Sequence, residues 1–336
     1  MYEAYYLLRT RPFGAGNCWL APQVAQSVQH AVASLQNGSE IVLITGPTGS
    51  GKSAVSRELA RQISSRLQPV VLAHCEFGSA GELWRTIQFE AGLDPVPTNC
   101  EDDARLGVLR AARGLRPQLD GMLIVADDAD ALRNALLDEL RRLTVQRHEG
   151  RPVVQLVLTG TFALEERLAN PDLSSLSHRI GQHIVLESLT RDESREYITF
   201  RIQDAGGQLH DVFTDAALDA IVAACDGNLH CLNQLCDHAL LLGFANEVRP
   251  VSPGIVTAAL DDLKGLSLPW NLPSTPAAEE TPQFAPREDR DPQVSLESDR
   301  TDENSTDGPA ADDRRSWWDD VGEAATIEVG AATAPQ

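Results

Sequence analysis

The sequence lacks the marks of an exported or membrane-inserted protein. None of its six cysteines stands in a Cys-x-x-Cys pair, and its opening residues show no basic segment followed by an apolar one. No apolar run approaches the roughly 20 residues that a helix needs to cross a bilayer. These absences argue against a secretory signal, a disulfide framework and a membrane span. We therefore expect a cytoplasmic protein with reduced thiols.

Positive charge is also scarce. The 336 residues include 28 Lys and Arg against 49 Asp and Glu, which gives a formal net charge of −21. Because phosphate contacts dominate the affinity of proteins for nucleic acids, this acidity argues against a broad nucleic-acid-binding surface. A local basic patch at Arg141, Arg142, Arg147 and His148 is the alternative. We interpret these residues as a solvated helix face.

A glycine-rich stretch with the context of a phosphate-binding P-loop lies near residue 50. It follows the apolar run 41–44 and precedes the helix-like run 54–60. This strand–turn–helix order suits a triphosphate, because backbone N–H groups at a helix N-terminus can wrap around it. The predicted cofactor-binding residues are Gly46, Pro47, Thr48, Gly49, Ser50, Gly51, Lys52 and Ser53.

Three features of this stretch carry the expected chemistry. Its glycines permit the close backbone approach and the unusual dihedral angles that the wrapping requires. Lys52 would neutralise phosphate oxygens, and Ser53 would give a hydroxyl to Mg²⁺. The alternatives are a turn that binds nothing and a dinucleotide-binding loop, but a dinucleotide-binding loop leaves Lys52 and Ser53 unexplained.

Short apolar runs alternate with helical patterns from residue 41 to residue 188. We expect strands at 41–45, 70–75, 122–126, 153–159 and 183–187, with helices near 52–66, 80–91, 102–114 and 132–148. Runs of this kind are typical of buried parallel strands. The alternation predicts an α/β fold, a P-loop NTPase parallel sheet sandwiched by helices.

The rest of the chain divides into three further parts. Residues 1–40 form a lead segment with a helix at 22–35. Its aromatic cluster either packs as core or flanks an adenine ring, and it consists of Tyr2, Tyr5, Tyr6, Phe13 and Trp19. Residues 189–265 read as an all-helical domain that opens with a capping box at Thr190–Glu193. Residues 266–336 read as a disordered acidic tail, because large apolar residues are few and 16 Asp and Glu face 5 Arg from Asn271 onward.

One aromatic pair interrupts this tail. Trp317 and Trp318 stand in a polar segment of a kind that usually lacks aromatic residues. The pair is either a docking motif for a protein partner or a feature that the tail merely tolerates.

The second half of a nucleotide site is expected at the end of the strand at 122–126. Asp127 follows this apolar run directly, which puts its carboxylate at the edge of the sheet where ligands bind in open α/β folds. There Asp127 would hold Mg²⁺, and Asp128 would orient or deprotonate the attacking water.

Three further residues are candidates for contact with the γ-phosphate. Thr159 and Thr161, at the end of the strand at 153–159, are either phosphate sensors or turn residues. Arg179 precedes the last strand and is either a surface arginine or an arginine finger for the nucleotide of a neighbouring subunit.

Residues 1–265 resemble the AAA+ ATPases of the general secretion pathway protein A type, which are related to the Mu-type transposition ATPases. The resemblance rests on an ordered set of stretches: Leu7–Phe13, the P-loop, the Asp127 strand, Leu158–Gly160, Leu164–Leu168, Ser177–Ile180, Tyr197–Gly206 and Asn228–Leu241. It implies ATP as the nucleotide, an all-helical lid at 189–265, and activity as a ring or filament. It also implies that His230 occupies the position where the lid of the family offers an arginine to the γ-phosphate.

Two further departures from the family pattern shape the expected function. The family usually has Glu where this chain has Asp128, and Asp is one methylene shorter, so we expect slow turnover. The acidic tail stands where secretion-type members continue into a membrane helix and a cell-wall-binding domain. We expect an ATPase that couples Mg-ATP binding and slow hydrolysis to conformational change in a homo-oligomer acting on a protein partner. The alternatives are a nucleotide-dependent scaffold, a DNA-associated adaptor of the transposition type and a small-molecule kinase.

Overall fold

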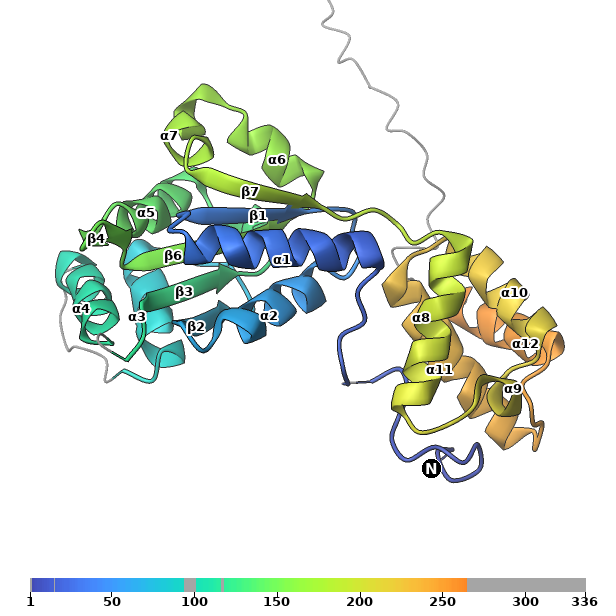
Figure 1. Ribbon diagram of the computed structural model, residues 1–336. Coiled ribbons are helices and arrows are strands. Elements are labelled where there is room, and N and C mark those ends of the chain that lie inside the picture. Colours follow the sequence, from blue (N-terminus) through green and yellow to red (C-terminus); the bar gives the residue numbers. More distant parts are fainter. Residues whose placement is uncertain (1, 15, 94–100, 116–117, 265–336) are drawn as a thin grey trace, which may run out of the picture. The chain divides into compact units, whose positions relative to one another are not determined.

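The computed structural model describes residues 2–14, 16–93, 101–115 and 118–264 (Figure 1). Cys100 and the tail with Trp317 and Trp318 lie outside the described residues, so the predictions for the tail stay predictions. The fold is α/β, as the alternating pattern predicts.

A five-stranded parallel sheet forms the centre of the fold. Its strands are β1 (Ile41–Thr45), β2 (Leu67–Leu72), β3 (Gly121–Ala126), β6 (Val154–Gly160) and β7 (Ile180–Val185). The order across the sheet is β2-β3-β6-β1-β7, and every neighbouring pair is parallel. The carboxyl ends of all five strands therefore meet at one edge, and the segments that follow them share that edge.

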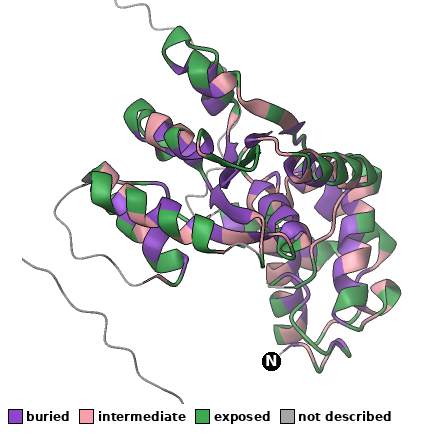
Figure 2. Cartoon of the chain, turned by 60° about the vertical axis from the view of Figure 1, so that its left-hand side comes forward, coloured by how far each residue is buried: buried purple, intermediate pink, exposed green. Residues whose placement is uncertain are grey.

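Helices cover both faces of the sheet (Figure 1). One face packs on α1 (Pro22–Gln36) and α2 (Lys52–Ile63), and the other on α3 (Ala80–Glu90), α4 (Glu101–Gly114), α5 (Asn134–Thr144), α6 (Phe162–Leu168) and α7 (Ser174–Ser177). Successive strand residues point to opposite faces, so Val42 and Ile44 join the first core while Ile41 and Leu43 join the second. Both faces of the central strands are buried (Figure 2), which explains why these strands are continuous apolar runs.

Residues 190–264 form a group of helices around a hydrophobic core of their own, which we call the lid. Its helices are α8 (Arg191–Asp204), α9 (Leu209–Val212), α10 (Asp215–Cys225), α11 (Leu229–Ala245) and α12 (Pro253–Lys264). The predicted capping box opens α8, because the Thr190 hydroxyl accepts from Glu193 N–H and the Glu193 carboxylate accepts from Thr190 N–H.

The lead segment is divided between two cores. Tyr2, Tyr6, Leu8 and Phe13 are buried in the core of the lid, whereas α1 packs on the sheet. The start of the chain consequently lies beside the lid helices in Figure 1. The prediction of 1–40 as a single segment missed this division. Both the aromatic residues and the helix that follows them contain apolar residues, and the sequence does not show which core each of them joins.

Several predicted boundaries differ from the structure for local reasons. β2 begins at Leu67 rather than at residue 70, because an edge strand tolerates Pro69. The helix expected to run to residue 148 ends at Thr144. A hairpin of β4 (Arg147–His148) and β5 (Arg151–Pro152) follows, and its turn residues Glu149 and Gly150 have φ of 52° and 80°. Two consecutive residues with positive φ are the geometry of a two-residue hairpin turn.

Candidate nucleotide-binding site

The predicted P-loop joins β1 to α2 at the carboxyl edge of the sheet. Gly49 and Gly51 have φ of 83° and 93°, a left-handed conformation that side chains other than glycine rarely adopt. Gly46 is required for a different reason, since a Cβ atom there would lie 2.5 Å from the Leu186 carbonyl oxygen. The loop therefore depends on its glycines both for its turn and for its packing against the segment after β7.

The Lys52 ammonium is buried inside this loop. Its Nζ donates to the carbonyl oxygens of Gly46 at 3.1 Å and Pro47 at 2.9 Å, and no described carboxylate lies within ion-pair distance of it. Burial lowers the pKa of Lys52, and the nearby carboxylates of Asp128, Asp130 and Asp127 oppose that shift. A buried cation held only by neutral carbonyl groups is well placed to exchange them for phosphate oxygens.

Ser50 provides a second sign that the loop accommodates an anion. Its hydroxyl is buried and has no hydrogen-bond partner among the described residues. Buried polar groups in folded proteins are nearly always satisfied, so an unpartnered hydroxyl within the loop calls for an explanation. A bound polyphosphate would provide the missing acceptor.

Asp127 and Asp128 lie at the end of β3, next to β6. Asp127 is 7% exposed, and its Oδ1 accepts from the Thr159 hydroxyl at 2.6 Å. The same hydroxyl oxygen accepts from the backbone N–H of Asp128 at 3.0 Å. Asp128 itself is exposed and has a left-handed backbone with φ of 54°. Thr159 thus fixes both acidic residues, a role that its prediction as a phosphate sensor did not include.

The hydroxyl of Ser53 and the carboxylate of Asp127 are hard oxygen ligands of the kind that Mg²⁺ prefers. Ser53 is half-buried at the second position of α2, and Asp127 keeps an oxygen that does not bond to Thr159. The donor set therefore suits Mg²⁺ held between a nucleotide and the sheet.

Thr161 lies beyond β6 and is tied to Asp130. Its N–H and hydroxyl donate to the two carboxylate oxygens of Asp130 at 2.8 and 2.9 Å, and its hydroxyl caps α6 by accepting from Ala163 N–H. Thr161 was predicted to be either a phosphate sensor or a turn residue, and these contacts are those of a turn residue. Its prediction as a nucleotide contact stays a prediction.

The lid reaches the P-loop through the start of α11. Asn228 donates from Nδ2 to the Thr48 carbonyl oxygen at 3.0 Å, and His230 N–H donates to that of Gly49 at 3.3 Å. Only the backbone of His230 makes this contact. Its exposed ring lines a different hollow, with Gln234, His238 and others of the lid and lead segment. The predicted role of His230 at the γ-phosphate stays a prediction.

Two hollows adjoin the P-loop at Gly51 and Ala54. One is a cleft of about 860 Å³ lined by the lead segment, α2 and the lid. The other is a narrower apolar pocket of about 40 Å³, whose lining includes Leu20, Val24, Leu186 and Leu189. Trp19 and Leu229 line both hollows. Neither Trp19 nor Leu229 was among the predicted site residues.

Arg179 lies at the opposite, amino edge of the sheet. It donates from Nη1 to Glu40 Oε2 at 2.5 Å, and Arg147 donates from Nη2 to Glu40 Oε1 at 2.5 Å. Glu40 is buried, and Thr144 also donates to it. Arg179 therefore has a structural partner within its own chain, and its predicted role on a neighbouring subunit stays a prediction.

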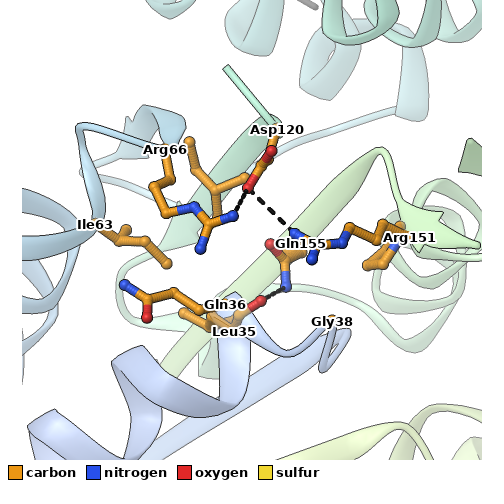
Figure 3. A pocket seen from close by; sticks show the side chains of 10 residues that line it. Leu35, Gln36, Gly38, Ile63, Arg66, Asp120, Arg151 and Gln155 are labelled. Atoms are coloured by element: carbon orange, nitrogen blue, oxygen red, sulfur yellow. Dashed lines mark hydrogen bonds and ion pairs between the residues drawn. The ribbon is translucent and has the colours of Figure 1, made fainter. Parts of the chain in front are cut away.

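A small hollow lies near Arg179 at the same edge. Figure 3 shows Arg66 and Arg151 pointing toward Asp120, while Gln155 donates to the Leu35 carbonyl oxygen. The hollow measures about 10 Å³, which is about the space that one water molecule needs. It is too small to be a ligand site.

The structure thus brings together most of the predicted site residues. The P-loop, Asp127, Asp128 and Thr159 meet at the carboxyl edge, whereas Arg179 and the ring of His230 lie elsewhere. The sequence analysis missed Asn228 as a P-loop contact. Its position before α11 marks it as an N-cap, and it does accept from His230 N–H and Cys231 N–H, but no local signal shows that the same side chain reaches Thr48.

The predicted basic patch is largely neutralised. Arg141 pairs with Asp138, and Arg142 pairs with Asp138 and Glu139. These contacts follow the helical spacing of α5, as expected for a solvated helix face. For Arg147 and His148 that interpretation is wrong, because both lie in β4 after the helix has ended. In the part of the chain that the structure describes, no helix is long and apolar enough to cross a membrane.

Comparisons with known proteins agree with this fold. The AAA domain family matches residues 35–168. General secretion pathway protein A of Aeromonas hydrophila is 26% identical over 280 residues, which cover 79% of this chain and 49% of that protein. The chain thus spans about half the length of this relative.

Solved structures share the fold at lower identity. Cdc6p from Pyrobaculum aerophilum has a TM-score of 0.62 at 18% identity and covers 75% of this chain and 70% of its own. The Aeropyrum pernix ORC2 protein, solved in ADPNP–ADP complexes, has a TM-score of 0.60 at 14% identity and covers 77% of this chain and 72% of its own. The family match, the shared sequence and the fold support an AAA+ P-loop ATPase of the general secretion pathway protein A type.

Proposed function

We propose that this protein binds Mg-ATP at the P-loop and hydrolyses it slowly. We further propose that the lid transmits the resulting conformational change to a homo-oligomer that acts on a protein partner. The observation that carries the proposal is the buried Lys52, which has no carboxylate partner among the described residues and lies in a loop with an unpartnered hydroxyl at Ser50. A polyphosphate supplies what both groups lack. The match to the AAA domain family supports the same ligand.

Each residue of the site has a defined task in this proposal. Lys52 exchanges its carbonyl contacts for oxygens of the β- and γ-phosphates, while backbone N–H groups of the loop donate to the other phosphate oxygens. Ser53 and Asp127 would hold Mg²⁺, which neutralises the charge that develops on the phosphate oxygens. Thr159 keeps Asp127 and Asp128 in place through its two hydrogen bonds.

Asp128 is the residue that orients or deprotonates the attacking water. Asp128 is exposed, has a left-handed backbone, and its charge acts on Lys52. Since a carboxylate on a shorter side chain reaches less far, we expect turnover to be slow. These features of Asp128 also favour the second candidate function, a nucleotide-dependent scaffold with little or no hydrolysis.

The lid contacts suggest how binding becomes movement. Asn228 and Leu229 touch the P-loop itself, so a loop that opens around phosphates must displace the start of α11. Arg179 would act on the nucleotide of a neighbouring subunit. A protein partner that docks at Trp317–Trp318 belongs to the same proposal.

The test is to measure ATP binding and ATP turnover on the same purified protein. Lys52→Ala is expected to abolish binding without unfolding the chain. The sequence offers a matched control, because Lys264 is its other lysine and lies exposed at the end of α12, paired with Asp261. Lys264→Ala is expected to bind and turn over ATP like the parent. Equal ATP binding by Lys52→Ala and the parent would refute the assignment of the site.

A third variant separates the two candidate functions. Asp128→Glu lengthens the side chain by one methylene and is expected to raise turnover if water is merely poorly placed in the parent. Binding without turnover in both the parent and Asp128→Glu would support the scaffold.

A further inference from the structure

We infer that Arg201 of the lid is a positioning residue: it holds in place the wall of the nucleotide site that faces the base. It holds the loop of the lead segment described at residues 12–14 and 16–19, so that Trp19 keeps its place beside the P-loop. This inference rests on the proposed function, since it assigns the neighbouring hollows to the nucleoside part of ATP.

The Arg201 guanidinium is buried and bonds to backbone rather than to acids. Its Nε donates to the Pro12 carbonyl oxygen at 2.6 Å, and its Nη2 and Nη1 donate to those of Gly14 at 2.5 Å and Asn17 at 3.4 Å. Arg201 is 7% exposed, and no described carboxylate lies within ion-pair distance of it. Burying an arginine is costly unless its donors are satisfied, so three carbonyl groups from one loop fix that loop closely.

A second contact ties the same loop to the same helix. Asn17 donates from Nδ2 to Asp204 Oδ1 at 2.5 Å and from its backbone to Asp204 Oδ2 at 3.3 Å. Arg201 and Asp204 stand one turn apart at the end of α8. Phe13 and Trp19 pack on the core of the lid, and these polar contacts hold the residues between them.

The loop leads directly to the residues that line the site. Trp19 packs edge-on against Tyr197 at a ring distance of 5.6 Å, and Tyr197 donates to Asn233 Oδ1 at 2.6 Å. Trp19 lines both hollows next to Gly51 and Ala54. Because α8 holds the loop and the loop carries Trp19, a movement of the lid also moves this wall. A base bound there is therefore sensed by the lid.

The decisive measurement compares ATP with inorganic tripolyphosphate, each with Mg²⁺. Both ligands occupy the P-loop, but only ATP has a base and a ribose. Arg201→Lys keeps the charge and loses the planar fork that reaches three carbonyl groups. We expect it to weaken ATP binding about tenfold, which is about 1.4 kcal/mol, and to leave tripolyphosphate binding unchanged within about twofold. The matched control is Arg195→Lys, on the same helix, where the exposed arginine pairs with Asp219.

Two further measurements keep the test decisive if Arg201→Lys folds poorly. Asn17→Ala removes the side-chain bond of the second anchor without touching the buried guanidinium, and it is expected to weaken ATP binding in the same selective way by a smaller factor. Alkylation of Cys18 by iodoacetamide, located by peptide mass, reports directly on the loop. We expect the loss of either anchor to speed this reaction, and Arg195→Lys to leave its rate unchanged.

The outcomes separate this inference from the proposed function. Unchanged ATP affinity, or an equal loss for ATP and tripolyphosphate, in a folded Arg201→Lys protein would overturn the positioning role. An unchanged rate of Cys18 alkylation in both variants would also overturn it. A parent protein that binds neither ligand would instead refute the proposed function, and the rate of Cys18 alkylation would still decide whether Arg201 anchors the loop.

Discussion

Thr159→Val is the substitution that most directly tests how the two acidic residues are held. Valine has nearly the shape of threonine but has a methyl group where threonine has its hydroxyl. Thr159 is fully buried, so no water replaces the lost group. The change removes a hydrogen bond to the Asp127 carboxylate and leaves the N–H of Asp128 without its acceptor.

The magnitude follows from these two contacts. A hydrogen bond to a charged group contributes roughly 1.5–3 kcal/mol, and one between neutral groups contributes about 1 kcal/mol. We therefore expect a loss of about 3 kcal/mol in the stability of the sheet domain, seen as a melting temperature lower by about 6–12 °C. Turnover should fall at least about tenfold, because Asp127 and Asp128 lose their common anchor. Binding of ATP without Mg²⁺ should change little, since the P-loop keeps its own contacts.

The assay is a thermal melt beside ATP binding and turnover, with Thr86→Val as the matched control. The Thr86 hydroxyl donates to the Glu82 carbonyl oxygen within its own helix, at an exposed position. Its loss should cost no more than about 0.5 kcal/mol. If Thr159→Val melts and turns over ATP like Thr86→Val, then Thr159 does not hold the acidic pair, and the argument is wrong.

Two further predictions concern the contacts of the lid. Gly49→Ala should abolish ATP binding, because its Cβ would lie 2.3 Å from Asn228 Oδ1. Gly92→Ala is the control: Gly92 also has a positive φ, of 68°, but has open space around it, so this variant should bind ATP like the parent. The pair of variants separates the effect of the clash from that of backbone strain. Burial alone would raise the pKa of Asp237, but hydrogen bonds, foremost from Arg11, lower it below its ordinary value of 3.8. Its contribution to stability is thus present above about pH 4 and is lost as the pH falls through the lowered pKa. The difference in melting temperature between the parent and Asp237→Asn should shrink below that pH, and a constant difference from pH 7 to pH 3 would contradict this account.

The sequence was enough to predict the parts of the site that depend on local pattern. The P-loop and Asp127 each directly follow a short apolar strand, so the strand pattern places them at one edge of the sheet. The α/β alternation likewise predicts the layers, because a buried parallel strand needs apolar residues on both faces. Strand ends were less predictable where Pro69 or the turn at Glu149–Gly150 changed the local geometry.

Contacts between distant residues were beyond this kind of reasoning. Tyr2 and Tyr6 read as generic core residues, and only the structure assigns them to the lid, where Tyr2 donates to Asp237 and Tyr6 to the Val248 carbonyl oxygen. Asn228 is the N-cap of α11, yet its amide also donates to Thr48 at a separation of 180 residues. A side chain with two polar ends can serve two partners, and a local pattern reveals only the nearer one.

Arg179 shows what the sheet itself decides about the mechanism. It stands directly before β7, whereas the P-loop follows the carboxyl end of the neighbouring strand β1. A strand of six residues spans about 20 Å at roughly 3.3 Å per residue, which no arginine side chain bridges. Arg179 therefore does not reach the nucleotide of its own chain. If it contributes to hydrolysis, it does so in a neighbouring subunit, and it must then exchange the carboxylate of Glu40 for a phosphate. Arg147 also binds Glu40, so that carboxylate keeps a cationic partner when Arg179 leaves.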